Sequence, residues 1–397
     1  MSSMSSSDKL DIVYLAQDNL EGQFARPQAI ARELARSFRV LFVNSFGYSL
    51  PRWALDRFAA KTPRHRVGLF SVAPNLWTVG FVPSLPNRGD FDWVRSVNIW
   101  LAAQQLRRAI RTLGFQNLVL WIGLVYAAPL VNLIPAALVC YDCMDNFPAF
   151  FRGRRRRAAE ILGAQLLQGS DLVIAASEEL YAKCRAANPY VHLVRNGVRA
   201  SDYARGAISL PAELRNLPRP ILGFWGTFGP WLDVELLQAL ALRYSQGSLV
   251  LVGPVKDAPV GGLSGLRNVH FLGMRPHDEG PRYLRGFDVC LIPFRQNELT
   301  TAVNPIKFYE YCAAGRPTVS VALPELAPYQ HLCYLAHSRE EFLQAVEASL
   351  KESENSGIVT ELGISRRKVA DDNSWEVRGR QIEAILATGM RRKKDRD

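Results

Sequence analysis

Short apolar runs alternate with longer amphipathic stretches along most of this chain, and the alternation recurs in both halves. In the first half, apolar runs at residues 10–16, 40–44 and 172–175 are typical of strands, and the pattern at 93–113 is typical of an amphipathic helix. Repeated alternation of strands and helices favours parallel sheets that are covered by helices on both faces. The sequence therefore predicts an α/β fold.

A stretch that contains Gly206, Pro211 and Pro218, lies directly before Pro220 and has little periodicity interrupts this alternation at residues 200–219. A second series follows, beginning with a strand expected at 221–225. Ligands of open α/β sheets bind at the carboxyl ends of the strands, so we expect two sheets that face each other across a cleft. The predicted division is an N-terminal Rossmann-like domain at 1–203, a C-terminal Rossmann-like domain at 204–375, and a last helix with a basic, disordered tail at 376–397.

The longest uncharged stretch covers residues 118–139, a length that could cross a bilayer as a helix. Pro129, Asn132 and Pro135 divide it, however, and buried parallel strands also look like continuous apolar runs. We therefore expect a strand, a short helix and a second strand here. The N-terminus lacks a basic region followed by an apolar run and is not predicted to be a signal peptide, so we expect a cytoplasmic protein.

The six cysteines lie mostly in apolar runs, which indicates buried, reduced thiols. Cys140 and Cys143 have the spacing of a zinc-binding pair, but no second pair of ligands has suitable spacing. The chain has 48 Lys and Arg against 37 Asp and Glu, a formal net charge of +11. Such a surface suits an anionic partner, which could be a nucleic acid, a phospholipid head group or a phosphorylated substrate.

The strongest local signal runs N-P-I-K-F-Y-E-Y-C-A-A-G-R-P-T from Asn304 to Thr318. Pro305 suits the first turn of a helix, and Lys307 and Glu310 are three residues apart and share a face near the helix N-terminus. Helix N-termini favour phosphate, a lysine adds positive charge, and a carboxylate can accept hydrogen bonds from two ribose hydroxyls. The pattern suits a nucleoside diphosphate. The alternative is an ordinary amphipathic helix with a Lys–Glu pair.

This segment resembles the C-terminal motif of family 4 glycosyltransferases and their GT-B relatives, and it is most similar to the teichuronic-acid and exopolysaccharide branch. The resemblance implies a GT-B fold and a metal-independent enzyme without a cofactor, which transfers a sugar from a nucleotide-sugar, expected to be UDP-linked. The implied acceptor is a glycan or a polyprenyl-linked glycan of a cell-surface polysaccharide. Further landmarks follow in the expected order at Phe24–Gln28, Tyr141–Phe147, Ser177–Leu180, Asn196–Val198 and Asn268–Gly273.

The same resemblance implies roles for single residues. Lys307 would contact the donor phosphates and Glu310 the ribose, and Met274 and Arg275 would lie near the base. A loop between a strand and a helix would lie under the diphosphate, where small residues let backbone N–H groups approach; a plain strand–helix turn is the alternative. The predicted donor-binding set is completed by Asn304 and by the residues of this loop, Gly226, Thr227, Phe228 and Gly229.

The chain departs from the family pattern in two ways. Retaining enzymes of family 4 carry two Glu separated by seven residues, and Ala302 stands where the first would precede Glu310. The loop at 226–233 also lacks the usual Arg and Lys. Asp142 and Asp145 follow an apolar strand, where a carboxylate could act as the general base of an inverting transfer. The alternative is that both aspartates cap the next turn.

A basic run at 152–157 follows three phenylalanines. Aromatic residues beside arginines suit an anionic membrane surface or a lipid-linked pyrophosphate, and a solvated helix start is the alternative. We expect peripheral attachment to the inner face of the cytoplasmic membrane. No nucleic-acid-binding motif occurs, so nucleic acid is not an expected partner. The predicted acceptor and membrane residues are Arg26, Phe150, Phe151, Arg154, Arg155 and Arg156.

Two other functions stay open. The missing glutamate at Ala302 allows a catalytically silent GT-B subunit that scaffolds a partner transferase. A GT-B sugar-nucleotide epimerase would need acid and base groups that converge on the donor sugar. Hydrolysis of a donor by the purified protein would separate an enzyme from a scaffold.

Overall fold

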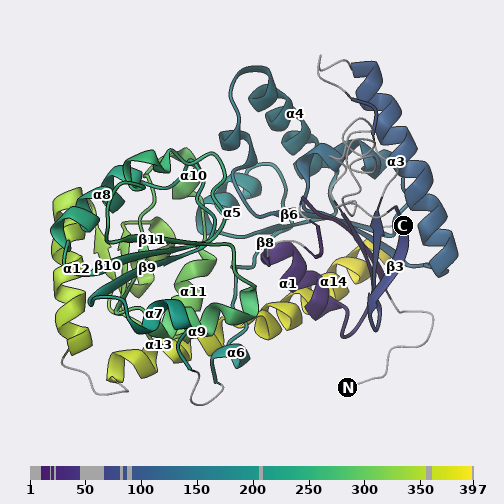
Figure 1. Cartoon of the computed structure of the whole chain (residues 1–397). Helices are drawn as coiled ribbons and strands as arrows, with labels where there is room; N and C mark the ends of the chain where they lie inside the picture. The colour runs from purple at the N-terminus through teal and green to yellow at the C-terminus, as the bar shows by residue number, and fades with distance from the viewer. Residues whose placement is uncertain are drawn as a thin grey trace. The chain divides into compact units, whose positions relative to one another are not determined.

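The computed structural model describes residues 10–17, 19–21, 24–44, 67–80, 84–86, 92–204, 209–354 and 360–395. The chain forms two compact units (Figure 1). Unit 1 comprises Met1–Ala176, Leu180–Val194 and Gly379–Asp397, and unit 2 comprises Ser177–Glu179 and Arg195–Arg378. The predicted domain limits after residues 203 and 375 both fall within unit 2.

Unit 1 is built on a sheet with the strand order β3-β4-β2-β1-β5-β6-β7-β8. All neighbouring strands are parallel except β3 and β4, which form an antiparallel pair at one edge. The order reverses between β1 and β5, which are buried throughout, as expected for continuous apolar runs. The strands are β1 (Asp11–Leu15), β2 (Arg39–Val43), β3 (Gly68–Ala73), β4 (Leu76–Gly80), β5 (Leu118–Ile122), β6 (Leu138–Cys143), β7 (Leu172–Ala175) and β8 (Val191–Leu193).

Helices cover both faces of this sheet. α1 and the C-terminal part of α14 lie on one face, and α3, η2 and α4 lie on the other (Figure 1). The uncharged stretch at 118–139 is confirmed as strand β5, 3-10 helix η2 and the start of strand β6. Among the described residues, no helix is long and apolar enough to cross a membrane. The helical elements are α1 (Arg26–Leu34), α3 (Asp92–Leu113), η2 (Val125–Asn132), η3 (Phe147–Phe150), α4 (Gly153–Gly169), α5 (Glu178–Arg185) and α14 (Trp375–Lys394).

Unit 2 is built on a parallel sheet with the order β11-β10-β9-β12-β13-β14, which reverses between β9 and β12. On one face α8 and α12 lie side by side, joined by ion pairs from Arg243 to Glu347 (2.9 Å) and from Arg339 to Glu235 (3.1 Å). α9, α11 and α13 lie on the other face (Figure 1). The strands are β9 (Ile221–Trp225), β10 (Ser248–Val252), β11 (Val269–Gly273), β12 (Val289–Ile292), β13 (Thr318–Val321) and β14 (Tyr334–Ala336).

The remaining elements of unit 2 are short helices and the helices that cover its sheet. They are α6 (Ser201–Ala204), α7 (Ala212–Arg215), α8 (Val234–Arg243), η4 (Val260–Gly262), η5 (His277–Glu279), α9 (Gly280–Gly286), α10 (Glu298–Thr301), α11 (Ile306–Ala313), η6 (Pro324–Tyr329), α12 (Arg339–Glu354) and α13 (Glu361–Asp372). The α/β class with mostly parallel sheets is confirmed. The six cysteines are confirmed as free, buried thiols.

The predicted disordered tail is wrong for the residues that the structure describes, because α14 continues to Lys394. Lys393 forms an ion pair of 2.7 Å with Asp171, and the Arg392 guanidinium lies 3.4 Å from the centre of the Tyr190 ring. Gly389 lets the helix approach the sheet, since a Cβ there would lie 2.7 Å from the Leu172 side chain. These contacts hold the basic end of the helix in unit 1.

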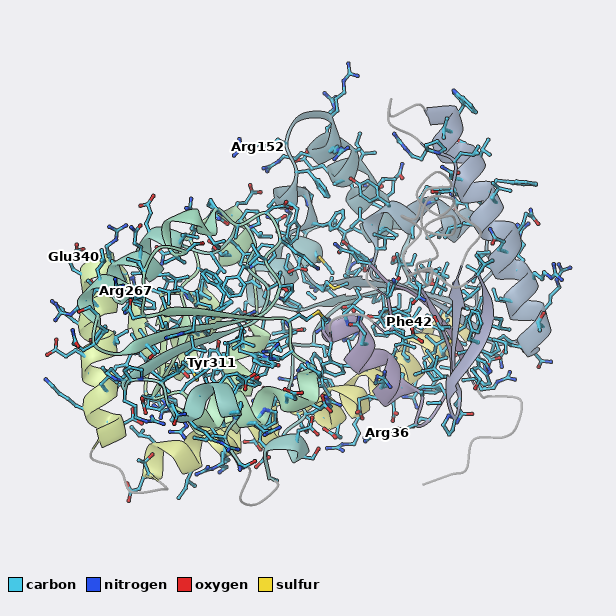
Figure 2. All side chains as sticks on the ribbon, viewed as in Figure 1. Arg36, Phe42, Arg152, Arg267, Tyr311 and Glu340 are labelled. Carbon is cyan, nitrogen blue, oxygen red and sulfur yellow. The ribbon has the colours of Figure 1, made fainter. Side chains whose placement is uncertain are left out.

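The apolar side chains of the strands and helices form the cores of the two units, and most charged side chains lie at the surface, as the sequence patterns predict. Figure 2 shows Phe42 inside unit 1 and Tyr311 inside unit 2, and both are fully buried. The labelled charged side chains Arg152 and Arg267 point outward. Phe42 stacks on Tyr14, with ring centres 5.5 Å apart.

Candidate functional site

Three glycines stand at the carboxyl ends of neighbouring strands of unit 2. Gly226 follows β9, Gly253 follows β10 and Gly273 ends β11, with φ angles of +145°, +144° and +69°. L-residues with side chains rarely adopt such angles. A Cβ on Gly253 would lie 2.0 Å from the carbonyl oxygen of Gly226, so the strand ends meet too closely for any larger residue. The missing side chains therefore let the strand ends pack closely, and at Gly226 they leave space for a neighbouring side chain.

Lys307 uses this space. A Cβ on Gly226 would lie 2.2 Å from Cε and 2.6 Å from Nζ of Lys307, so the lysine side chain lies directly against the glycine backbone. Its Nζ is 5.4 Å from the centre of the Phe224 ring and 5.7 Å from that of Phe294. Burial lowers the pKa of Lys307, and the charge of Glu310 acts in the opposite direction. The predicted lysine thus lies at the edge of the sheet, where burial disfavours its charged form.

Helix α11 is fixed over the point where the strand order reverses. Its Tyr311 hydroxyl accepts a hydrogen bond from the backbone N of Trp225 in β9 and donates one to the carbonyl of Leu291 in β12, both 3.2 Å long. Pro305 is the N-cap, and the helix begins at Ile306. The predicted helix start is confirmed to within one residue, and Lys307 lies in the first turn.

Glu310 is buried, with 4% of its surface exposed. Its Oε1 lies 2.8 Å from Nε2 of His277 in η5, and Nδ1 of His277 lies 3.0 Å from Nη2 of Arg199. Arg199 also forms an ion pair of 3.0 Å with Asp202. The structure thus brings Lys307 and Glu310 onto one face of α11, as predicted, and adds a histidine and an arginine that were not predicted.

The Asn304 side chain is already occupied by protein contacts. Its Nδ2 donates to Glu325 (2.8 Å) and to the Tyr309 hydroxyl (3.1 Å), and its Oδ1 accepts from the backbone N of Asn196. Asn196 Nδ2 also donates to the carbonyl of Asn304. Both amide protons of Asn304 are used, so this residue shapes the turn before α11 rather than offering a donor to a ligand.

Only the first part of the predicted 226–229 loop is accessible. Phe228 is fully buried and its ring packs 5.1 Å from that of Phe224. The backbone N of Gly226 donates to Val252 and that of Phe228 donates to Pro254. Gly229 is buried, and a Cβ on it would lie 2.3 Å from the Trp231 ring. Two of the N–H groups expected to face a diphosphate are therefore bound within the protein.

Met274 and Arg275 follow the end of β11. Met274 is exposed, whereas Arg275 turns toward α7 and α9. Arg275 Nε donates to the Tyr283 hydroxyl (2.9 Å) and its Nη2 to Glu213 (3.1 Å). The hydrogen bond to Tyr283 is the main reason why the pKa of Arg275 is raised. Of this predicted pair, Met274 is the side chain that a base could contact.

Asp142 and Arg26 form a buried ion pair in unit 1. Arg26 Nη2 lies 2.9 Å from Asp142 Oδ1, its Nε donates to the same carboxylate, and Tyr14 donates to Oδ2 at 3.0 Å. Arg26 Nη1 also donates to the carbonyl of Val194. Arg26 is 2% exposed and Asp142 is 1% exposed. The pair joins α1, β1, β6 and the end of β8, so neither residue is placed to meet a membrane or an acceptor.

Asp145 lies two residues beyond the end of β6 and is only partly buried. Its backbone carbonyl accepts a hydrogen bond of 2.8 Å from Phe147. Its charge raises the pKa of Arg26 as a minor contribution beside that of Asp142. Of the two predicted carboxylates, Asp145 is therefore the one that a substrate could reach.

The aromatic residues before the basic run form a cluster around Tyr126. Its ring centre is 5.6 Å from that of Phe147 and 6.1 Å from that of Phe151, and Phe147 lies 5.2 Å from Phe151. Phe150 is exposed at the edge of this cluster. Phe147 and Phe151 therefore anchor η3 to η2, and only one of the three phenylalanines points to solvent.

The basic run itself begins α4. Arg154 and Arg155 are exposed. Arg156 is partly buried and forms an ion pair of 3.0 Å with Glu160. The predicted cationic surface is thus present at this helix start, and Figure 2 shows the neighbouring Arg152 projecting from it.

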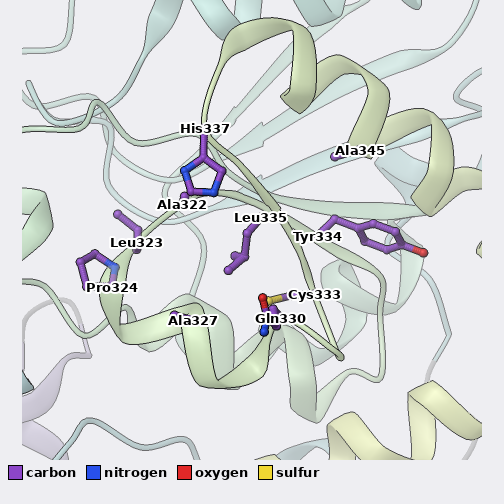
Figure 3. A pocket seen from close by; sticks show the side chains of 10 residues that line it. All are labelled: Ala322, Leu323, Pro324, Ala327, Gln330, Cys333, Tyr334, Leu335, His337 and Ala345. Carbon is purple, nitrogen blue, oxygen red and sulfur yellow. The ribbon is translucent and has the colours of Figure 1, made fainter.

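A cavity of about 620 Å³ lies elsewhere in unit 2, between the end of β13, η6, β14 and α12 (Figure 3). Its lining is mostly apolar, with Gln330, Tyr334 and His337 as the residues that carry polar groups. None of the predicted donor-binding residues lines it. Within the described residues, no group of three or more His, Cys, Asp and Glu side chains could hold a metal ion.

Comparison with known proteins agrees with this architecture. Residues 219–352 match the family described as glycosyl transferases group 1. Over 268 residues the chain is 29% identical to TuaH of Bacillus subtilis (strain 168), a protein assigned to teichuronic acid biosynthesis as a glycosyltransferase. That match covers 62% of this chain and 65% of TuaH, so it spans just under two thirds of the relative's length.

Solved structures resemble nearly the whole chain. Sucrose-phosphate synthase from Thermosynechococcus elongatus has a TM-score of 0.73 at 15% identity, covering 96% of this chain and 98% of that one. Anabaena HepE in complex with UDP and glucose has a TM-score of 0.64 at 15% identity, covering 95% and 99%. The α,α-trehalose-phosphate synthase (UDP-forming) from Burkholderia vietnamiensis has a TM-score of 0.63 at 11% identity, covering 96% and 98%. These similarities show the fold, and they confirm the expected GT-B architecture.

Proposed function

We propose that this chain, which resembles the group 1 glycosyl transferases and has the GT-B fold, transfers a sugar from a nucleotide-sugar to a glycan or lipid-linked acceptor. The observation that carries the proposal is the pairing of Lys307 with the glycine-lined edge of the unit 2 sheet, one helical turn before the buried carboxylate of Glu310. A cation and a carboxylate at this spacing match the diphosphate and the ribose of one nucleotide.

The donor assignment is that Lys307 binds the diphosphate, Glu310 the ribose hydroxyls, and the exposed Met274 the base. Lys307 lies in the first turn of α11, where a helix N-terminus adds to the attraction for phosphate. Gly273 is exposed and a Cβ there would meet no atom within 4 Å, so a ligand has room to approach the backbone at this strand end. A UDP-sugar is the favoured donor because HepE, whose architecture is similar, is described in complex with UDP.

The proposed general base is Asp145, and the proposed outcome is inversion. The position of the first family glutamate is held by Ala302, which is buried and whose carbonyl accepts a hydrogen bond of 2.7 Å from Ser177. A retaining arrangement with two glutamates is therefore incomplete. Asp145 is favoured because it is a partly exposed carboxylate beyond the end of a strand, whereas the buried pair of Asp142 with Arg26 argues against this role for Asp142.

The proposed acceptor is a glycan carried on a lipid, and the proposed docking partner is an anionic membrane. Helix α3 exposes Trp93 (65%) and Trp100 (54%), which are seven residues apart and so lie on one helical face. Arg108 and Arg111 continue that face and are exposed. Trp favours membrane interfaces, and basic residues favour anionic lipid. Helix α4, with its basic start, lies on the same face of the unit 1 sheet as α3 (Figure 1).

The test is transfer by the purified protein from UDP-sugars to lipid-linked acceptors, with product configuration read by NMR. An inverted anomeric centre supports Asp145 as the base, whereas a retained one removes it from that role. A scaffold subunit remains the second candidate because Ala302 provides no carboxylate. A protein that binds UDP but neither hydrolyses nor transfers any sugar would favour the scaffold.

A further inference from the structure

We infer that His277 is a positioning residue that, held by Arg199, presents the Glu310 carboxylate to the ribose of the nucleotide. This inference rests on the proposed function, because it assumes that Glu310 binds ribose. The geometry that suggests it is a chain of three side chains in unit 2, with 3.0 Å from Arg199 Nη2 to His277 Nδ1 and 2.8 Å from His277 Nε2 to Glu310 Oε1.

The first contact determines which ring nitrogen of His277 carries the proton. A guanidinium can only donate hydrogen bonds, so Nδ1 of His277 must accept one from Arg199 and cannot itself be protonated. The proton of the ring is therefore on Nε2, and Nε2 donates it to Glu310. A doubly protonated ring would place two N–H groups against each other at the Arg199 contact.

The second contact leaves one carboxylate oxygen for a ligand. Glu310 Oε1 is bound by His277, whereas Oε2 has no hydrogen-bond partner among the residues that the structure describes. A carboxylate oxygen that no protein group binds can accept a hydrogen bond from a ribose hydroxyl, and hydrogen bonds to charged groups are stronger than those between neutral groups. Lys307, one turn away on α11, forms no ion pair with Glu310 in the described chain. His277 thus holds the carboxylate while the lysine remains available for phosphate.

Calorimetry on the whole protein with UDP, 2′-deoxy-UDP and 3′-deoxy-UDP tests the inference. The wild type should bind UDP on the order of 10-fold or more tightly than the analogue that lacks the contacted hydroxyl, as expected for a hydrogen bond to a charged group. H277A should lose most of this discrimination. H277Q should retain it in good part, because its amide can accept from Arg199 and donate to Glu310. His331→Ala, an exposed histidine of the same unit, is the control and should behave as wild type.

A second measurement does not depend on nucleotide. Long-range ¹H–¹⁵N spectra of histidine-labelled protein should show a neutral ring with its proton on Nε2, and the signal should disappear in H277Q. A proton on Nδ1, or a charged ring at neutral pH, would overturn the inference.

The measurements distinguish a failure of the proposed ribose site from a failure of the inference about His277. If the wild type and Glu310→Gln bind all three nucleotides alike, the ribose site itself is misplaced. If the wild type discriminates and folded H277A discriminates equally well, the ribose site stands and His277 does not position it. A merely structural histidine would lower the melting temperature of H277A without changing the ratio of affinities.

Discussion

The side chain of Lys307 lies across Gly226 so closely that a Cβ on the glycine would be 2.2 Å from Cε of the lysine. The glycine also has a φ of +145°, which residues with side chains rarely adopt. The backbone conformation of Gly226, at the end of β9, and the position of the Lys307 side chain, in the first turn of α11, therefore depend on each other.

Gly226→Ala should consequently affect both stability and nucleotide binding. The backbone strain alone is worth about 1–3 kcal/mol, and the new methyl group displaces the lysine from the edge of the sheet. We expect a lower melting temperature and weaker binding of UDP by calorimetry. Gly265→Ala is the matched control, since a Cβ there meets no atom within 4 Å. Unchanged UDP affinity in folded Gly226→Ala would separate the lysine from the nucleotide site.

Lys307→Met should weaken UDP binding by about 1.5–3 kcal/mol, the usual range for a hydrogen bond to a charged group.

Because burial lowers the lysine pKa in the folded protein, the unfolded chain holds more protons between that lowered pKa and the ordinary value of 10.5. In this window, rising pH should stabilise the wild type relative to Lys307→Met, since the charged form is disfavoured by folding.

Nucleotide affinity should show the opposite trend over the same window. A bound diphosphate favours the charged lysine, so wild-type affinity should fall as the pH rises above the lowered pKa, whereas Lys307→Met should lack this fall. Titrations of UDP at several alkaline pH values, and thermal melts of both proteins, provide the comparison. A parallel fall in both proteins would assign the pH dependence to another group.

Asp142→Asn should mainly reduce the stability of the protein, whereas Asp145→Asn should mainly reduce its turnover. Removing one partner of a buried ion pair costs about 3–5 kcal/mol, so Asp142→Asn should be strongly destabilised, as measured by denaturant unfolding. The double variant Arg26→Met with Asp142→Leu should recover part of that loss, because it leaves no unpaired buried charge.

Asp145→Asn should keep nearly wild-type stability and UDP affinity while turnover falls about 10²–10⁴-fold, as expected for loss of a general base. Turnover of Asp145→Asn within twofold of wild type would contradict the assignment. An unstable Asp145→Asn would point instead to a role in the turn before η3.

Replacing both Trp93 and Trp100 by Ser should reduce binding to vesicles that contain anionic lipid, because these exposed rings supply the apolar contact. Leu242→Ser is the control, since Leu242 is an equally exposed apolar side chain in unit 2. Flotation assays should also show weaker binding at higher salt, which screens charges beyond about 8–10 Å at 0.1–0.15 M. Equal binding to neutral vesicles would argue against an anionic surface as the partner.

Buried parallel strands were the easiest elements to predict. The strands at 172–175 and 221–225 have the predicted limits, because each is a fully buried apolar run, with Asp171 before the first and Pro220 and Gly226 on either side of the second. The antiparallel pair of β3 and β4 was not predicted. β3 is an edge strand whose residues are at best partly buried, so its sequence lacks a continuous apolar run.

In the candidate site, the arrangement of residues close together in the sequence was predicted, whereas contacts between residues far apart in the sequence were not. The shared face of Lys307 and Glu310 follows from their spacing on one helix. The pair of Arg26 and Asp142 joins residues 116 apart, and no pattern along the chain indicates it. Arg199 directly follows the landmark that ends at Val198, and His277 lies two residues beyond the predicted Arg275. Inspection of residues that flank a recognised motif could therefore have suggested them.

The path of the chain between the units limits how the protein can be re-engineered. Most of unit 2, Arg195–Arg378, is inserted between segments of unit 1, and Gly379–Asp397 returns to complete the first unit. A chimera that exchanges the nucleotide-binding half with that of a relative therefore needs two junctions, near 194/195 and 378/379, and a matching 177–179 segment. A simple C-terminal truncation would instead remove the helix that packs on Leu172 and pairs with Asp171, so it would damage the first half of the protein rather than the second.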